Sequence, residues 1–275
     1  MIVESAPAKI NLALHIRRRR ADGYHDLETI FAFARDGDVV TVAPAQRDEF
    51  AVVGPFAAAL QGSRSNLVTQ AADGFRSTFG IDARHAITLD KRLPIASGIG
   101  GGSADAAATL RALAKLHGID PQHPQLFAIA EALGADVPAC LLGRPALGKG
   151  KGEQLAPLPP FGALPLLLVN PRVALATAPM FAAWDGIDRG PIASEGSVLA
   201  RAGLGGNDFT APAVQAAPVI AEMLMMLSGV RGSSFVRMSG SGASCFALFD
   251  THEARDAAAV EATRRGWWTL ATTLD

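Results

Sequence analysis

The sequence contains little of what several common protein classes require. Two cysteines in 275 residues are too few for a disulfide framework, and both lie among apolar residues, as buried thiols do. Aromatic residues make up 6% of the chain and the formal net charge is −1, which argues against a nucleic-acid surface. No apolar run approaches the roughly 20 residues that cross a bilayer. Because Glu4 and Lys9 interrupt the N-terminus, we expect no signal peptide and a cytoplasmic protein.

Two common phosphate-binding motifs are also missing. Four glycines occupy the five positions 98–102, and Ser103 follows them directly. A Walker A loop would need a lysine before its serine or threonine. A dinucleotide fingerprint would need a third glycine where Ser103 stands, and no strand begins close enough behind the next helix. The glycine-rich segment 93–110 therefore belongs to neither of these two classes.

What this segment does contain predicts an anion-binding turn. Residues 86–91 are typical of a short strand and residues 103–116 of an alanine- and leucine-rich helix, whereas the glycines between them fit neither. A helix N-terminus carries about half a positive charge and several unpaired N–H groups, which bind phosphate well. Ser103 is expected to cap this helix, with its hydroxyl also available to a phosphate or a metal ion. The alternative is a serine-capped turn that binds nothing.

Residues 9–17 alternate between apolar and polar side chains and predict a half-buried strand. Lys9 and Asn11 open its polar face. Lysine is scarce, with five among 25 basic residues, so a lysine in an apolar strand is a candidate site residue. A solvated strand lysine is the alternative, and the sequence leaves both interpretations open.

Tyr24 is the only tyrosine in the chain and precedes His25 in a glycine-containing turn. The basic run 17–20 before it is expected to be a solvated loop. Together the two rings could stack on and hydrogen-bond a ring-bearing ligand. Alternatively, Tyr24 packs on the next strand.

Asp136 is a lone carboxylate among apolar residues, directly after an amphipathic helix over residues 124–133 that Gly134 is expected to end. As a structural residue it could cap a short turn that begins at Val137. As a functional residue it is a candidate general base.

The remaining pattern predicts two domains, residues 1–154 and 155–275, with a linker-like boundary at the glycines and prolines of 148–160. The first domain adds strands and a helix capped by Ser65 or Asn66. In the second, strand, helix, hairpin, helix and strand follow one another, which is the order of a ferredoxin-like unit. The expected elements lie at 27–33, 38–42, 50–53, 66–79, 164–169, 178–184, 212–227, 235–238, 244–249, 252–265 and 267–273.

Residues 7–12, 93–107 and 238–246 resemble, in kind and order, the three motifs of the GHMP small-molecule kinases. The Tyr24-His25 turn and residues 133–138 narrow the resemblance to a member whose acceptor carries a cytidine diphosphate. The resemblance implies an α+β, two-domain GHMP kinase fold, with an N-terminal nucleotide-binding α/β domain and a C-terminal ferredoxin-like domain. Loops of this family often have glycines where Ala96 and Ser97 stand and asparagine where Asp105 stands.

The resemblance also implies an enzyme of isoprenoid biosynthesis that transfers a phosphoryl group from ATP, with Mg²⁺, to a small-molecule alcohol. Asp136 would accept or orient the proton of that hydroxyl, and Lys9 would be its partner and stabilise the transferred group. Ser103 is the nearest candidate ligand for Mg²⁺. The residues implied to bind ATP are Asn66, Leu67, Pro94, Ile95, Ala96, Ser97, Gly98, Ile99, Gly100, Gly101, Gly102, Ser103 and Ala104. The residues implied to bind the acceptor are Asn11, Tyr24, His25, Phe181, Gly240 and Gly242.

Two alternatives share this expected fold. One is a sibling kinase that acts on homoserine, mevalonate or a sugar. The other is a catalytically inactive ligand-binding regulator, which should have lost Lys9 or Asp136. We expect neither a nucleic acid nor a membrane as a partner.

Overall fold

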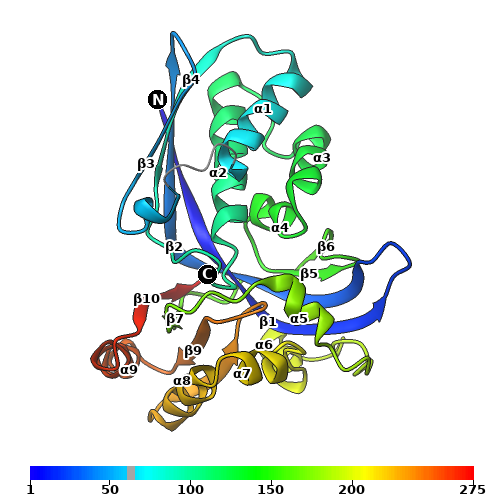
Figure 1. Ribbon diagram of the computed structural model, residues 1–275, viewed down its shortest axis with the longest axis vertical. Helices are drawn as coiled ribbons and strands as arrows, with labels where there is room; N and C mark the ends of the chain where they lie inside the picture. The colour runs from blue at the N-terminus through cyan, green and yellow to red at the C-terminus, as the bar shows by residue number, and fades with distance from the viewer. Residues whose placement is uncertain (61–65) are drawn as a thin grey trace. The chain divides into compact units, whose positions relative to one another are not determined.

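The computed structural model describes residues 1–60 and 66–275, and the chain forms two compact units (Figure 1). The first unit contains Met1–Ala8, Asp36–Ile95 and Gly100–Gly143, and the second contains Lys9–Arg35, Ala96–Ile99 and Arg144–Asp275. The chain therefore passes between the units several times. The boundary expected between residues 154 and 155 concerns sequence domains and stays a prediction.

The first unit combines a small sheet with a group of helices. Its strands are the start of β1 (Ile2–Arg19), the end of β2 (His25–Ala45), β3 (Glu49–Val53) and β4 (Arg84–Asp90). β4 pairs antiparallel with β2 and parallel with β3. The expected strands 27–33 and 38–42 are one continuous strand, since β2 runs through the polar residues between them.

Helices α1 (Leu67–Phe79), α2 (Gly101–His117), α3 (Pro124–Leu133) and α4 (Val137–Leu142) pack on one another, and Figure 1 shows them grouped together. Alanine dominates the buried face of α2, which lets its neighbours approach closely. The expected helix cap Ser65 lies outside the described residues, whereas Asn66 does cap α1. The unit also contains the short helix η1 (Ala57–Leu60).

The second unit contains the predicted ferredoxin-like arrangement. Its four main strands pair antiparallel in the order β10-β7-β9-β8, which is 4-1-3-2 when they are counted along the chain. Helices α8 and α9 contribute to one apolar core with β7 and β9, so both lie on the same face of this sheet. The strands are β7 (Leu164–Asn170), β8 (Ser233–Met238), β9 (Cys245–Phe249) and β10 (Trp268–Leu274). The helices are α5 (Thr177–Ala182), α6 (Val198–Leu204), α7 (Thr210–Ala216), α8 (Val219–Gly229) and α9 (His252–Arg264).

Two expectations about the second unit were wrong, and one of its helices was not expected. The linker-like residues 148–152 belong to a hairpin between β5 (Ala146–Lys149) and β6 (Gln154–Pro157). The single helix expected over 212–227 is two helices, because Pro218 lacks the N–H that would continue α7. Helix α6 was not expected at all.

Strand β1 (Ile2–Arg19) was expected to be half-buried but is buried on both faces around Lys9. Both cysteines are free and buried, as predicted. Among the described residues, no helix combines the length and the apolar character that a membrane crossing requires.

Candidate active site

Lys9 and Asn11 form a buried polar network in the second unit. Lys9 is 3% exposed, which rules out the solvated strand lysine. Its Nζ donates to Asn11 Oδ1 over 2.9 Å and lies 5.5 Å from the ring centroid of Phe31. Asn11 Nδ2 donates in turn to Thr29 Oγ1 over 2.8 Å, and Thr29 donates to the Ala13 carbonyl. A buried ammonium is costly unless it is bonded, so this network holds the Lys9 side chain in place.

Two glycine-containing segments of the second unit contact each other through their backbones. Gly98 has φ +76°, and a Cβ added to it would lie 2.5 Å from the Ser239 carbonyl oxygen. Ser239 Oγ donates to the Gly98 carbonyl over 2.9 Å, and the Ser244 amide donates to the Ser97 carbonyl over 3.1 Å. The turn 239–243 therefore approaches residues 97–98 closely.

The Lys9 network and these segments are connected. The Lys9 amide donates to the Ile99 carbonyl over 2.9 Å, and the Asn11 amide donates to Ser239 Oγ over 3.3 Å. A Cβ on Gly240 would lie 2.7 Å from the Gly98 carbonyl oxygen, so only glycine fits there. The structure thus brings Lys9 and Asn11 together with residues 97–99 and with the turn 239–243.

Sequence reasoning missed Asn207, which supports this turn. Its Nδ2 donates to the carbonyls of Met238 and Gly240, each over 2.8 Å, while its Oδ1 accepts from the Phe209 amide. These partners lie about thirty residues away in sequence, so no local pattern indicated them.

Aromatic rings gather around His25 in the second unit. The Phe181 ring stacks on the His25 ring at 4.8 Å between centroids and 19°, and Trp184 approaches edge-on at 5.8 Å. Burial, followed by the charge of Arg19, lowers the pKa of His25 below its ordinary value, which favours the neutral imidazole. Tyr24 is 59% exposed, and its ring lies 5.0 Å from Lys151 Nζ. The structure brings His25 together with Phe181 and with Trp184, a residue that sequence reasoning missed.

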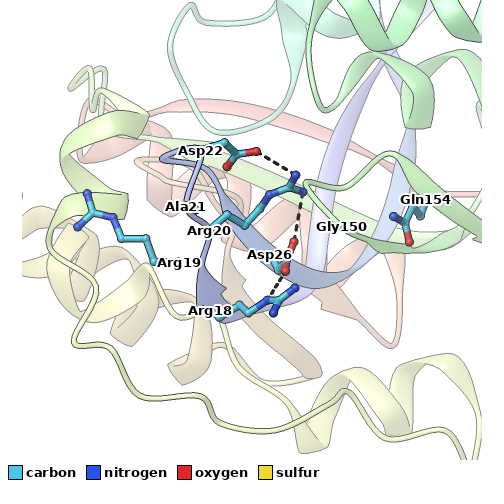
Figure 2. Close-up of a pocket in the computed structure, with 8 residues that line it drawn as sticks. All are labelled: Arg18, Arg19, Arg20, Ala21, Asp22, Asp26, Gly150 and Gln154. Carbon is cyan, nitrogen blue, oxygen red and sulfur yellow. Dashed lines mark hydrogen bonds and ion pairs between the residues drawn. The ribbon is translucent and has the colours of Figure 1, made fainter.

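A pocket of roughly 710 Å³ lies beside the turn that carries Tyr24, with three arginines in its lining (Figure 2). Arg18 and Arg20 pair with Asp26, and Arg20 also pairs with Asp22. Figure 2 shows Arg19 directed away from this group. Most of the cationic charge is therefore neutralised within the pocket. Arg17, Arg18 and Arg19 continue strand β1. The prediction that residues 17–20 form a loop was therefore wrong for these three arginines.

In the first unit, helix α2 begins within the run of glycines, at Gly101. Gly100 is its N-cap residue with φ +65°, and the structure shows no side-chain cap there. Ser103 lies within the first turn, so the expected serine cap was wrong. The first turn of a 17-residue helix presents backbone N–H groups and a positive dipole, which suit a phosphate. Leu67 Cδ1 would lie 3.6 Å from a Cβ on Gly102, so the start of α1 adjoins the start of α2.

Asn66 uses its side chain to cap α1. Its Oδ1 accepts from the amides of Val68 and Thr69 over 2.9 and 3.0 Å. Pro94 and Ile95 precede the glycines, and Ile95 is 36% exposed. The roles implied for these residues towards ATP stay predictions.

Asp136 occupies the N-cap position of α4, but its carboxylate does not cap that helix. The capping interpretation is therefore wrong, and Asp136 is half-buried at the helix start. Arg111 holds α4 through a 2.8 Å bond to the Cys140 carbonyl and also binds Glu4 and the Ser5 carbonyl. The position of Asp136 is thus defined by a helix that is anchored to α2 and to β1.

Sequence reasoning also missed a buried ion cluster in the first unit. Lys91 Nζ lies 2.6 Å from Asp38 Oδ2 and 2.6 Å from Asp105 Oδ2. Burial alone would lower the pKa of Lys91, but the two carboxylates outweigh it and raise that pKa above its ordinary value. Burial raises the pKa of Asp105 to about 7, against the opposing effect of Lys91 and with a smaller contribution from Asp38.

Comparisons with known proteins agree with this architecture. A family model described as GHMP kinases N terminal domain matches residues 66–144, and one described as GHMP kinases C terminal matches residues 198–266. Curated proteins named 4-diphosphocytidyl-2-C-methyl-D-erythritol kinase are similar over nearly the whole chain. The one from Rhizorhabdus wittichii is 54% identical, covering 98% of this chain and 94% of its own length. The one from Novosphingobium aromaticivorans is 48% identical, covering 97% and 90%.

Solved structures give the same result. The crystal structure of 4-(cytidine 5'-diphospho)-2C-methyl-D-erythritol kinase is similar with a TM-score of 0.83 and 35% identity over 99% of both chains. A homoserine kinase from Cytophaga hutchinsonii, at 17% identity and a TM-score of 0.66, shares the fold alone. The chain belongs to the GHMP kinase family, and within it to the 4-diphosphocytidyl-2-C-methyl-D-erythritol kinases.

Proposed function

We propose that this chain transfers the γ-phosphoryl group of ATP to the 2-hydroxyl of 4-diphosphocytidyl-2-C-methyl-D-erythritol. The products are the 2-phosphate and ADP, in the non-mevalonate route to isoprenoid precursors. The observation that carries the proposal is the 54% identity to a kinase of that name over 98% of the chain. We also propose that the reaction takes place in the cytoplasm.

Lys9 and Asp136 are the residues we propose for the transfer. The buried Lys9 ammonium, held by Asn11, would stabilise negative charge on the transferred phosphoryl group. The Asp136 carboxylate would orient the acceptor hydroxyl and take its proton late. Phosphoryl transfer has a loose transition state, so positioning and charge stabilisation contribute more than base strength.

The aromatic group in the second unit supports a ring-bearing acceptor. His25 and Phe181 already stack, and Trp184 closes one side of them. A neutral His25 can donate from one ring nitrogen and accept at the other, which suits the mixed edge of cytosine. We propose that His25, Phe181 and Tyr24 hold the cytosine, and that Asn11, Gly240 and Gly242 complete the acceptor site.

For ATP, we propose that the start of α2 and residues 94–104 hold the phosphates and that Asn66 and Leu67 lie near the adenine. Mg²⁺ fits this donor set, because it usually keeps several waters and binds through phosphates and one or two protein oxygens. Among the described residues, no group of three or more acidic, histidine or cysteine side chains could hold a metal. We propose Ser103 Oγ, in the first turn of α2, as a protein ligand. The bound ion would neutralise charge on the phosphates.

The test is ATP consumption by the purified protein with Mg²⁺ and four acceptors. The acceptors are diphosphocytidyl-methylerythritol, mevalonate, homoserine and galactose. We expect turnover with the cytidine-bearing acceptor alone. Turnover with another acceptor would refute the assignment of Tyr24 and His25, and binding without any turnover would favour a regulator.

The same assay tests the two proposed catalytic residues. Lys9→Ala and Asp136→Asn should each lower turnover by at least about 10²–10³, the usual effect of losing one preorganised charge. Asp120→Asn makes the same substitution at an exposed carboxylate and should leave turnover unchanged. Near-full activity in either of the first two variants, with the fold intact by circular dichroism, would refute the mechanism.

A further inference from the structure

The buried ion cluster of Lys91, Asp38 and Asp105 lies against the start of α2 in the first unit. The three residues are at most 3% exposed, and Lys91 Nζ is 2.6 Å from a carboxylate oxygen of each aspartate. Removing these charges from water is expensive unless the partners keep good geometry. The cluster can therefore fix the relative positions of the backbone segments that carry it.

One carboxylate of the cluster binds the upstream end of the segment. Asp38 Oδ1 accepts from the amides of Arg92 and Leu93, over 2.6 and 2.8 Å. Its other oxygen accepts from Lys91 Nζ. The backbone immediately before Pro94 is thus tied to strand β2.

The other carboxylate binds the downstream end. Asp105 lies near the start of α2 and accepts from Lys91 Nζ through Oδ2. In the described part of the chain, the buried Oδ1 of Asp105 has no hydrogen-bond partner. A single oxygen of this side chain therefore makes the connection.

The start of α2 needs this support. Gly100, at the N-cap position, has no side chain with which to hold the first turn. A Cβ on Gly101 would lie 3.1 Å from Lys91 Nζ and 3.6 Å from Asp38 Oδ2. The Lys91 ammonium is therefore in contact with the first residue of the helix. The cluster does not cap the helix, but its contact with Gly101 and its bond to Asp105 fix the position of the helix start.

We propose that Asp105, acting through Lys91 and Asp38, is a positioning residue for ATP, because it holds both ends of the glycine-rich segment and thereby aims the first-turn N–H groups of α2 at the phosphates. This inference rests on the proposed function, since it takes ATP as the ligand. Asp105 itself touches no reacting atom in this proposal. Its loss should weaken nucleotide binding while leaving acceptor binding unchanged.

The test compares three substitutions at Asp105. Asp105→Leu removes the acceptor for Lys91 and should raise the KM for ATP about tenfold, with kcat and the KM for the acceptor within about twofold of wild type. Asp105→Asn retains an oxygen in the same place and should keep the KM for ATP within about twofold. Asp105→Glu keeps the carboxylate but displaces it by one methylene. Its KM for ATP should lie between those of Asp105→Leu and Asp105→Asn.

Lys115→Met is the matched control, because it removes a cation from the same helix that pairs with Glu4 and does not contact the cluster. It should leave the KM for ATP unchanged. Titration of each variant with Mg²⁺–ADP alone gives nucleotide affinity without any acceptor. ADP affinity tests the positioning role of Asp105 separately from the proposed function. If the acceptor were wrongly assigned, turnover would be absent but ADP would still bind.

Three outcomes would overturn the inference. The first is that Asp105→Leu lowers the melting temperature or the active fraction but leaves both the KM for ATP and ADP affinity unchanged. The second is that Asp105→Asn weakens nucleotide binding as much as Asp105→Leu. If Asp105→Leu does not fold, Asp105→Glu is the variant that tests the inference. The third outcome is that Asp105→Glu binds ADP with wild-type affinity.

Discussion

The two units hold their parts of the glycine-rich segment by different chemistry. In the first unit, the amides of Arg92 and Leu93 and, through Asp105, the start of α2 are tied to the Lys91 ion cluster, whose three residues are buried. In the second unit, residues 97–99 are held by backbone amides, by the Ser239 hydroxyl and by direct backbone contact with Gly240. The contacts in the second unit are therefore made by uncharged groups, and they are close because glycine has no side chain.

This difference predicts different sensitivities. A buried ion cluster depends on which groups are charged, so it responds to substitutions of a single polar atom and to protonation. A backbone contact between glycines depends on space, so it responds to any added Cβ. The following four predictions test this comparison, in order of decreasing expected effect.

Gly98→Val should have the largest effect. The new Cβ would meet the Ser239 carbonyl at 2.5 Å, and φ at Gly98 is +76°. Backbone strain and the clash together should lower the free energy of unfolding by about 3 kcal/mol or more, measured by urea denaturation. Gly186→Val is the control, because φ there is +78° with no atom within 4 Å, so it should show the strain alone. If both variants lost the same free energy of unfolding, the close contact at Gly98 would have no steric effect, which would contradict the prediction.

Asn207→Leu should lower the free energy of unfolding by about 2 kcal/mol, because the carbonyls of Met238 and Gly240 lose their donor. The KM for the acceptor should rise with it, since the turn 239–243 loses its support. Ser234→Ala removes one bond to the Leu248 carbonyl in the same sheet and should cost less than about 1 kcal/mol. A loss at Asn207 no larger than at Ser234 would show that the turn holds its shape without the amide.

His85 tests the response of the first unit to pH. It is 3% exposed, and its Nε2 lies 2.9 Å from His117 Nε2. Burial, followed by the charge of His117, lowers the pKa of His85 below 6.5. Below pH 6.5 the unfolded chain therefore binds more protons than the folded chain, and the free energy of unfolding falls as the pH falls.

His85→Phe should remove this contribution, which is at most about 1.4 kcal/mol per pH unit for one group. Urea denaturation at pH 7.5 and at pH 5.5 gives the difference. His252→Gln replaces an exposed histidine of the second unit and should leave the pH dependence unchanged. The same pH dependence in wild type and His85→Phe would contradict the expectation.

Ala96→Gly should have the smallest effect. Ala96 has φ +51°, a conformation that costs a residue with a Cβ about 1–2 kcal/mol. Glycine relieves this strain but loses about 0.5–1 kcal/mol of chain entropy, so we expect a net gain near 0.5 kcal/mol. Ala257→Gly, at an exposed position inside α9, offers no strain to relieve and should lose about 1 kcal/mol of stability. If Ala96→Gly also lowered the free energy of unfolding, the positive φ of Ala96 would not be a source of strain.

Much of the fold could be predicted from local pattern. The ferredoxin-like order of the second unit, helix α3 with Gly134 as its C-cap residue, and the Asn66 cap of α1 all follow from short-range rules. Failures occurred where tertiary packing overrides local signals. The polar residues inside β2 and the glycines between β5 and β6 were read as breaks, although pairing with other strands holds them in the sheet.

Candidate site residues divide in the same way. Lys9, His25 and Phe181 could be named from residue type and motif, and the structure places them in one unit with the neighbours described above. Asn207 and Trp184 could not be named, because their partners are distant in sequence. For Ser103, the motif suggested a cap, but the helix begins two residues earlier.

By itself, the sequence determined the kind of chemistry, because glycine, lysine and aspartate at motif spacing bring specific donors, charges and backbone freedom wherever the chain folds. Only the tertiary structure decided how those groups are held. Asp38, Lys91 and Asp105 are up to 67 positions apart and meet because strand pairing and helix packing bring them together. Burial then strengthens their interaction, and burial is a property of the folded chain and not of any short stretch of sequence.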